Sequence, residues 1–185
     1  MSFADVGRGF EDGEADDEAR LIAATIDGIR VISVYVPNGQ DLESDKFAYK
    51  LRWLGRLRRY LERTATPTTP LVVCGDYNIT IDDRDVWSPE AWAGKIHCSP
   101  IERAALAEIT AFPLVDLFRK HHPDGGVYSW WDYRGVSLFK NQGLRIDHLL
   151  ATQPVADRCT ACEIDREARK GQDASDHAPV IATLS

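Results

Sequence analysis

The chain has 185 residues, of which 44% are hydrophobic and 28% are charged, and its formal net charge is −7. This composition fits one globular domain, expected over 1–185, and the negative charge argues against non-specific nucleic-acid binding by the whole surface. No stretch approaches the ~20 apolar residues of a membrane span, and the acidic start lacks the features of a signal peptide, so we expect a cytoplasmic protein without membrane contact.

The first predicted elements are two strands joined by a tight turn. Residues 21–26 and 29–36 are rich in β-branched side chains. Asp27-Gly28 between them is a two-residue hairpin signal. We therefore expect a β-hairpin here, preceded by an acidic, glycine-rich loop.

An amphipathic helix and a buried strand come next. Apolar residues recur at helical spacing from Phe47 to Leu61. The arginines of this segment are expected on a solvated face rather than in a DNA groove. They are Arg52, Arg56, Arg58, Arg59 and Arg63. The continuous apolar run 71–74 predicts a buried strand.

A long ordered loop is expected over 79–98, followed by a helix. Ser99-Pro100 with Glu102 forms a capping box with proline at the first helical position, and the helix should run to about Phe112. Residues 115–120 fit either a short strand or a helical turn. Strands outnumber helices along the chain, which predicts a layered α+β domain with helices outside.

Further strands are expected over 128–131, 145–151, 158–164 and 179–184. Cys159 and Cys162 form one C-x-x-C, and a zinc site would need two further ligands at suitable spacing. We interpret both cysteines as reduced structural residues on a strand.

Polar side chains follow the ends of several predicted strands. Asp76 and Asn78 come just after the run 71–74, and side chains two apart on an extended segment point the same way. Each polar pair alone is well explained by turn chemistry. Together they predict a site at the mouth of the sheet. The members are Tyr35, Asp76, Asn78, Asn141, Asp147, Asp176 and His177. This set suits zinc poorly but suits Mg²⁺, with Mn²⁺ as a substitute.

From about Leu21 to its end, the chain resembles the exonuclease III family of DNA-repair nucleases within the endonuclease/exonuclease/phosphatase superfamily. The matching segments are VYVPNG, GDYNI, YSWWDYR, NQGLRIDHLLAT and ASDHAPV. The resemblance implies a four-layer α/β/β/α sandwich. It also implies a Mg²⁺-dependent abasic-site endonuclease and 3′→5′ exodeoxyribonuclease, acting on duplex DNA with abasic sites or 3′ ends.

The resemblance further implies a role for each residue of the site. Asp76 would exchange a proton near the metal and the attacking water, and Asn78 would orient that water or hold the transition-state phosphate. His177 would contact the scissile phosphate and act as an acid–base group, with Asp147 fixing its orientation.

Four more positions receive roles in the same way. Asp176 would join Asp76 and Asn78 on the metal side. Tyr35 would bond the phosphate or leaving group, Trp130 would line a pocket for an extrahelical abasic sugar, and Asn141 would position its loop or contact DNA.

The family's opening strands, with an asparagine motif and a metal-binding glutamate motif, have no counterpart here, so the resemblance implies an N-terminally truncated form. We favour a truncated or wrongly started gene product. The alternatives are a remnant that folds with a partner or a catalytically impaired chain with a DNA-binding or hetero-oligomer role. A phosphatase acting on lipids is a weaker alternative, because YSWWDYR and GLRID are typical of the DNA-directed branch.

Overall fold

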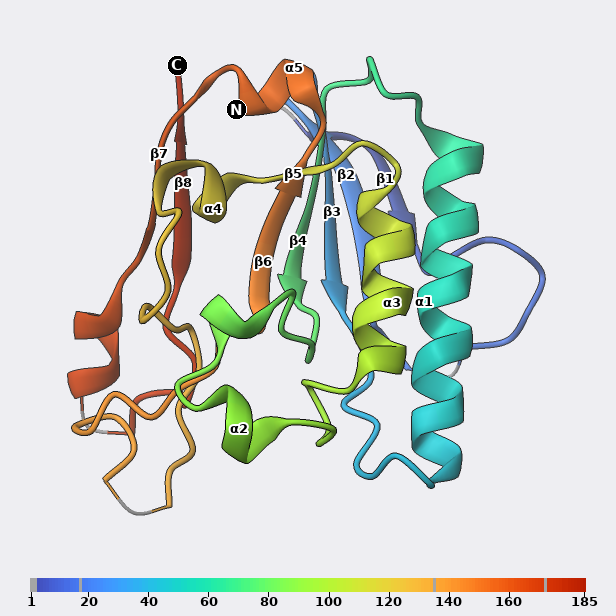
Figure 1. The fold of residues 1–185 in the computed structure, drawn as a ribbon. Helices are drawn as coiled ribbons and strands as arrows, with labels where there is room; N and C mark the ends of the chain where they lie inside the picture. Colours follow the sequence, from blue (N-terminus) through green and yellow to red (C-terminus); the bar gives the residue numbers. More distant parts are fainter. Residues whose placement is uncertain (1–2, 17, 135, 172) are drawn as a thin grey trace.

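A six-stranded sheet forms the centre of the protein. The computed structural model describes residues 3–16, 18–134, 136–171 and 173–185. The strands are β1 (Phe3–Arg8), β2 (Leu21–Ile26), β3 (Ile29–Tyr35), β4 (Leu71–Asp76), β5 (Val115–Asp116) and β6 (Asp147–Ala151). Their order is β1-β2-β3-β4-β6-β5 (Figure 1), and only the β3–β4 pair is parallel among the described strands.

The predicted hairpin is confirmed in β2 and β3. Asp27 and Gly28 have φ angles of 47° and 82°, the left-handed values that a two-residue turn of this kind requires. The register pairs Ile26 with Ile29 directly across the turn. A tight turn of this geometry fixes which side chains of both strands face the core.

Two helices cover one face of the sheet (Figure 1): α1 (Asp45–Thr64), which connects the parallel strands β3 and β4, and α3 (Pro100–Thr110). The predicted capping box of Ser99 and Glu102 is present at the start of α3. Fully buried Trp53 and Leu57 of α1 share a hydrophobic cluster with Val73 of β4. No helix in the described residues is both long and apolar enough to cross a membrane.

A second, antiparallel sheet packs on the opposite face. It consists of β7 (Cys159–Ile164) and β8 (Val180–Leu184). Buried Cys159 and Cys162 share a cluster with Val72 and Leu149 of the central sheet. The register shifts between Cys159 and Ala161, and such an irregularity changes the alternation of side chains along a strand. Both cysteines lie on the strand β7, as predicted, and neither forms a disulfide.

The predictions of a loop at the start of the chain and of a strand over 128–131 are wrong. Residues 3–8 form β1, whose largely exposed side chains give no alternating pattern, so its pairing with β2 comes from the backbone. In the second segment Trp130 makes single bridges to Leu144 and His177 instead of a strand. Because these bridges involve one residue and two different partners, the segment forms no continuous ladder of backbone hydrogen bonds.

Short elements fill the remaining connections. Residues 115–120 combine both predicted possibilities, because β5 leads directly into α4 (Leu117–His121). The loop over 79–98 contains two short helices that the sequence did not predict, and two more follow β6 and β7. These four are η1 (Asp83–Asp85), α2 (Pro89–Trp92), α5 (Gln153–Ala156) and η2 (Arg166–Lys170).

The arginine face of α1 is only partly solvated, as a correction to the sequence prediction. Arg52 and Arg59 are exposed, but Arg56 is buried. Its guanidinium makes two hydrogen bonds to Asp12, at 2.9 and 2.8 Å, and lies over the ring of Phe10. Arg56 therefore anchors the segment between β1 and β2, a role that helical periodicity cannot reveal.

Candidate active site

Three neighbouring strands of the central sheet carry polar residues at the same end of the sheet. Tyr35 at the end of β3 is paired with Asp76 at the end of β4, and Asp76 is paired with Asp147 at the start of β6. Directly paired residues on neighbouring strands point to the same face. The sheet therefore gathers three predicted site residues that lie far apart in the sequence.

Gly75 allows β3 and β4 to approach closely just before Asp76. Its φ angle is +138°, and a Cβ atom at this position would lie 1.9 Å from the carbonyl oxygen of Val34. Only glycine fits without a backbone shift. The glycine of the GDYN segment is thus required by the geometry that places Asp76.

Asn78 fixes the orientation of the Asp76 carboxylate. Its backbone N–H donates to Asp76 Oδ1 at 2.7 Å, and its side-chain Nδ2 donates to Asp76 Oδ2 at 3.0 Å. Nδ2 also donates to the Val36 carbonyl, and Oδ1 accepts from Asn38 Nδ2 at 3.0 Å. Asn78 is 4% exposed. Its side-chain amide therefore links the Asp76 carboxylate to Val36 and Asn38.

His177 and Asp147 form a carboxylate–imidazole pair. Nδ1 of His177 lies 2.8 Å from Asp147 Oδ2, and because a carboxylate accepts, Nδ1 carries the proton. Nε2 of His177 lies 4.0 Å from Asp76 Oδ2. The hydroxyl of Ser129 also donates to Asp147 Oδ2, at 2.7 Å. Asp147 is thus held between a buried serine and the histidine that it orients.

The facing acid and imidazole have shifted pKa values. Burial, followed by the negative charge of Asp147, raises the pKa of Asp76 to about 7 despite the opposing effect of His177. Burial lowers the pKa of His177, but the hydrogen bond and charge of Asp147 outweigh this effect, so the net shift is upward. A carboxyl group whose pKa lies near neutral pH, placed beside an imidazole, suits general acid–base chemistry.

Trp130 stands beside this pair and forms one wall of an apolar cluster. Its Nε1 donates to Asp176 Oδ2 at 2.9 Å, and its backbone bridges to His177. The half-buried ring packs against the cluster of Val86, Cys98, Leu144 and Ile146. Asp176 is therefore adjacent to the site, but its carboxylate makes no hydrogen bond to Asp76 among the described residues.

Of the two remaining predicted residues, Tyr35 lies beside Asp76 at the end of β3, and Asn141 lies in a separate loop. Tyr35 is 48% exposed, and the Arg20 guanidinium lies 4.9 Å from the centre of its ring. Asn141 donates from Nδ2 to the Gly126 carbonyl at 2.9 Å, with its own backbone at a φ of 53°. Asn141 therefore secures a loop and, within the described chain, makes no hydrogen bond to the Asp76 group.

Sequence reasoning missed several residues that support the site. Ser129 is fully buried between aromatic residues, where a hydroxyl needs a partner. Lys50 and His97 contact the carbonyl of Asn78. A lysine within the apolar face of α1 was a usable signal for Lys50, because buried lysines are rare unless paired. His97 gave no local signal.

The oxygen atoms at this end of the sheet suit a hard divalent cation as ligands. Carboxylate and amide oxygens are its preferred ligands, and a cation would offset the burial and the Asp147 charge that raise the pKa of Asp76. Within the described ranges, no group of three or more His, Cys, Asp or Glu side chains is arranged to hold a metal ion. A bound ion would therefore complete its shell with water and substrate oxygens.

Removing the hydroxyl of Ser129 should impair the site without unfolding it. In Ser129→Ala, the backbone N–H groups of Ile146 and Asp147 lose their acceptor, which lowers stability, and the Asp147 carboxylate loses one donor, at a net cost of about 1 kcal/mol. If that cost falls on the orientation of His177, turnover should drop roughly five- to tenfold. Thr25→Ala, which removes an exposed hydroxyl bonded to Asp5, is the control. Equal turnover in both variants, measured as kcat for DNA incision, would contradict a positioning role for Ser129.

A sheet sandwich with an acid–histidine pair at the strand ends has the arrangement of a hydrolase that uses an activated water. The profile of the Endonuclease/Exonuclease/phosphatase family matches residues 7–177. The chain belongs to this family, in the branch of the exodeoxyribonuclease III nucleases. Nucleases of this family depend on metal ions.

Two curated relatives are similar to most of this chain. The exodeoxyribonuclease III of Haemophilus influenzae is 34% identical over 189 residues, which cover 96% of this chain and 71% of that protein. The exodeoxyribonuclease of Bacillus subtilis is 30% identical over 168 residues, 90% of this chain and 64% of that protein. The chain thus spans about two thirds of the length of these relatives.

Solved structures confirm the predicted fold class. A 3′ phosphatase from Neisseria bound to a product DNA hairpin is 40% identical with a TM-score of 0.94, covering 100% of this chain and 72% of that one. An AP endonuclease from Archaeoglobus fulgidus is 39% identical with a TM-score of 0.94, covering 99% of this chain and 71% of that one. The prediction of a DNA-repair nuclease is confirmed at the level of the family.

Proposed function

We propose that this chain hydrolyses phosphodiester bonds in duplex DNA, at abasic sites and at 3′ ends, with Mg²⁺ as its cofactor and Mn²⁺ as a substitute. The observation that carries the proposal is the alignment of Asp147, His177 and Asp76, in which Asp147 fixes the imidazole and Nε2 faces the second carboxylate. Phosphodiester hydrolysis needs this kind of paired acid and base close to an activated water.

The proposed chemistry assigns proton transfers to named atoms. The oxygen of a water bonds to phosphorus, the bridging P–O bond on the far side breaks, Asp76 accepts the proton that the water loses, and the departing oxygen takes up a proton from solvent. His177 presents Nε2 to the phosphate, because Nδ1 is held by Asp147. Bound Mg²⁺ would supply positive charge to the non-bridging oxygens, held by Asp76 with oxygen donors from Asn78 or Asp176.

An abasic site would be recognised by residues that lie next to Asp76 and His177. The half-buried ring of Trp130, whose Nε1 is bonded to Asp176 and whose far side packs on buried Leu144 and Ile146, offers an aromatic wall, which suits a deoxyribose that has lost its base. Tyr35 would bond the phosphate or leaving group from the other side. Asn141 would act through its loop, since its amide is bonded to Gly126.

DNA binding without catalysis is the second candidate. It is favoured by one observation, namely that no three side chains of metal-binding type converge in the described part of the chain. A binding protein would retain its affinity for the duplex when the metal is removed and would never cut it.

Metal removal tests the proposal directly. A duplex with one abasic site should be incised in the presence of Mg²⁺ and left intact in EDTA, and excess Mg²⁺ should restore cutting. The product is measured on a denaturing gel, and binding is measured in parallel by a mobility shift. Incision that persists in EDTA would refute the metal-dependent mechanism. Binding without incision under every condition would favour the second candidate.

A further inference from the structure

Lys50 of α1 is a buried cation that contacts Asn78, the residue that holds the Asp76 carboxylate. Its side chain is 0% exposed. Its Nζ donates to the carbonyl oxygen of Asn78 at 2.8 Å, to that of Asn38 at 3.1 Å, and to Glu102 Oε2 at 2.6 Å. Lys50 thus uses all three of its donors on groups that surround the end of β4.

Glu102 fixes this cation from a second helix. Its carboxylate is also 0% exposed, and its other oxygen accepts from the Ser99 backbone at 2.9 Å as part of the capping box of α3. The Lys50–Glu102 pair therefore ties α1 and the start of α3 to one point. Both side chains are held from several sides, so the position of Nζ is well determined.

His97 provides a second donor to the same oxygen of Asn78. Its Nδ1 lies 2.7 Å from the Asn78 carbonyl, and because a carbonyl only accepts, Nδ1 carries the proton. Two donors on one carbonyl hold the backbone of Asn78, which has a φ of 51°. A non-glycine residue keeps this conformation only when its surroundings enforce it.

The fixed backbone directs the Asn78 side chain to Asp76. With its carbonyl facing Lys50 and His97, Asn78 turns Nδ2 toward Asp76 Oδ2 at 3.0 Å. We propose that Lys50, assisted by His97, is a positioning residue that orients the Asp76 carboxylate through Asn78. This inference rests on the proposed function, in which Asp76 exchanges the proton of the attacking water.

A purely structural role for Lys50 makes different predictions. A structural pair would contribute to folding only, so its loss would lower stability and leave turnover of the folded protein unchanged. A positioning group acts on the reacting geometry, and a displacement of about 1 Å at such a site can cost roughly a hundredfold in rate. Turnover, compared with substrate affinity, therefore separates the two roles.

The test uses variants Lys50→Met, His97→Ala and His97→Asn, with Arg56→Met as the control. Asparagine can place its Nδ2 where histidine has Nδ1, so His97→Asn should restore what His97→Ala loses. Arg56 lies on the same helix and forms a buried ion pair with Asp12, away from Asn78. Its loss should lower stability and leave kcat unchanged.

For DNA incision with Mg²⁺, kcat should fall roughly 10- to 100-fold in Lys50→Met and His97→Ala, with KM within about threefold of the wild type. His97→Asn should recover to within about threefold of the wild type. Loss of kcat in Arg56→Met as large as in His97→Ala, or no difference between His97→Ala and His97→Asn, would overturn the inference. The His97 pair decides the question if Lys50→Met fails to fold.

A second measurement does not depend on nuclease activity. The side-chain amide signals of Asn78 can be identified in a ¹⁵N NMR spectrum as those that vanish in Asn78→Ser. They should shift in Lys50→Met and His97→Ala and stay in place in His97→Asn and Arg56→Met. These shifts in an inactive chain would uphold the positioning contact and refute the proposed function. Unchanged signals in Lys50→Met and His97→Ala would overturn the positioning inference itself.

Discussion

Asp76→Asn should abolish most DNA incision and, at the same time, stabilise the metal-free protein. An amide cannot accept the proton of the attacking water, and removal of a general base typically costs 10²–10⁴-fold in rate. We therefore expect kcat for cutting a single abasic site with Mg²⁺ to fall by roughly that factor. Retention of activity within tenfold of the wild type would show that another group takes the proton.

The stability gain follows from the raised pKa of Asp76. Folding moves this pKa from 3.8 to about 7, so the stability present at low pH is lost as the pH rises through that interval. A shift of about three units corresponds to roughly 4 kcal/mol. Part of it is offset in the variant, because the new amide faces Asn78 Nδ2 and a buried N–H donor is left unpaired, at a cost of about 2–3 kcal/mol.

We expect Asp76→Asn in EDTA to be more stable than the wild type by about 1–2 kcal/mol at pH 8, with no gain at pH 4. Urea unfolding at both pH values measures the difference. Asp124→Asn, at an exposed position, removes the same charge outside the site and should leave stability unchanged at both. A variant that is less stable than the wild type at pH 8 would mean that the Asp76 carboxylate is not strained by its surroundings.

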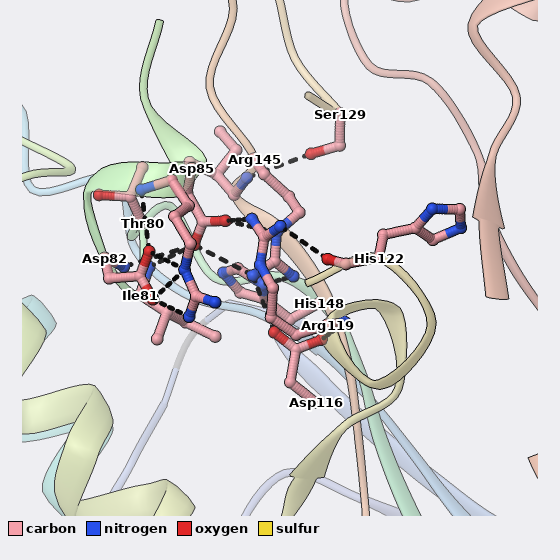
Figure 2. A network of polar contacts seen from close by, with 12 residues as sticks. Thr80, Ile81, Asp82, Asp85, Asp116, Arg119, His122, Ser129, Arg145 and His148 are labelled. Atoms are coloured by element: carbon pink, nitrogen blue, oxygen red, sulfur yellow. Dashed lines mark hydrogen bonds and ion pairs between the residues drawn. The ribbon is translucent and has the colours of Figure 1, made fainter. Parts of the chain in front are cut away.

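Disruption of a buried ionic network should have the second large effect, which is a loss of stability. Figure 2 shows Arg145 between Asp85 and Asp116, with Arg119 and His148 beside them. Arg145 donates to both oxygens of Asp85, at 2.7 and 3.0 Å, and to Asp116 at 2.8 Å. Arg145 and Asp85 are 0% exposed. The network links Asp85, in the loop after β4, to Arg145, which lies two residues before Asp147 at the start of β6.

Asp85→Ala should destabilise the protein by about 3–5 kcal/mol, because it leaves a buried guanidinium without its main partner. For a chain of this length the melting temperature should fall by roughly 6–20 °C, as measured by circular dichroism. Arg84→Ala is the matched control: it breaks the neighbouring Arg84–Asp82 pair, whose side chains are 50% and 37% exposed. That change should cost less than about 1 kcal/mol.

Similar melting temperatures for Asp85→Ala and Arg84→Ala would mean that water reaches Arg145 and replaces its partner. Asp85→Leu combined with Arg145→Met should recover part of the loss, because no buried guanidinium remains at position 145, while Asp116 and Arg119 each lose one ion-pair partner. A double variant less stable than Asp85→Ala would show that Arg145 stabilises the fold through its other contacts, to Asp116 Oδ2 at 2.8 Å and His148 Nδ1 at 3.0 Å.

The local elements and the types of the reacting groups could be predicted from the sequence. The Asp27-Gly28 turn and the Ser99–Glu102 capping box were readable because their signals lie within a few residues. Asp76, Asn78, Asp147 and His177 were identified as site candidates from short motifs that resemble a known family. Each of these signals is local, so neighbouring residues suffice to read it.

The way in which these groups meet could not be predicted, because it depends on long-range strand pairing and packing. Pairing of β4 with β6 places Asp76 opposite Asp147, and a buried hydroxyl from Ser129 completes the support of Asp147. Lys50 joins the end of β4 from a helix that periodicity describes only as amphipathic. Such contacts join residues tens of positions apart, and their burial and mutual hydrogen bonds depend on packing, which no local pattern in the sequence encodes.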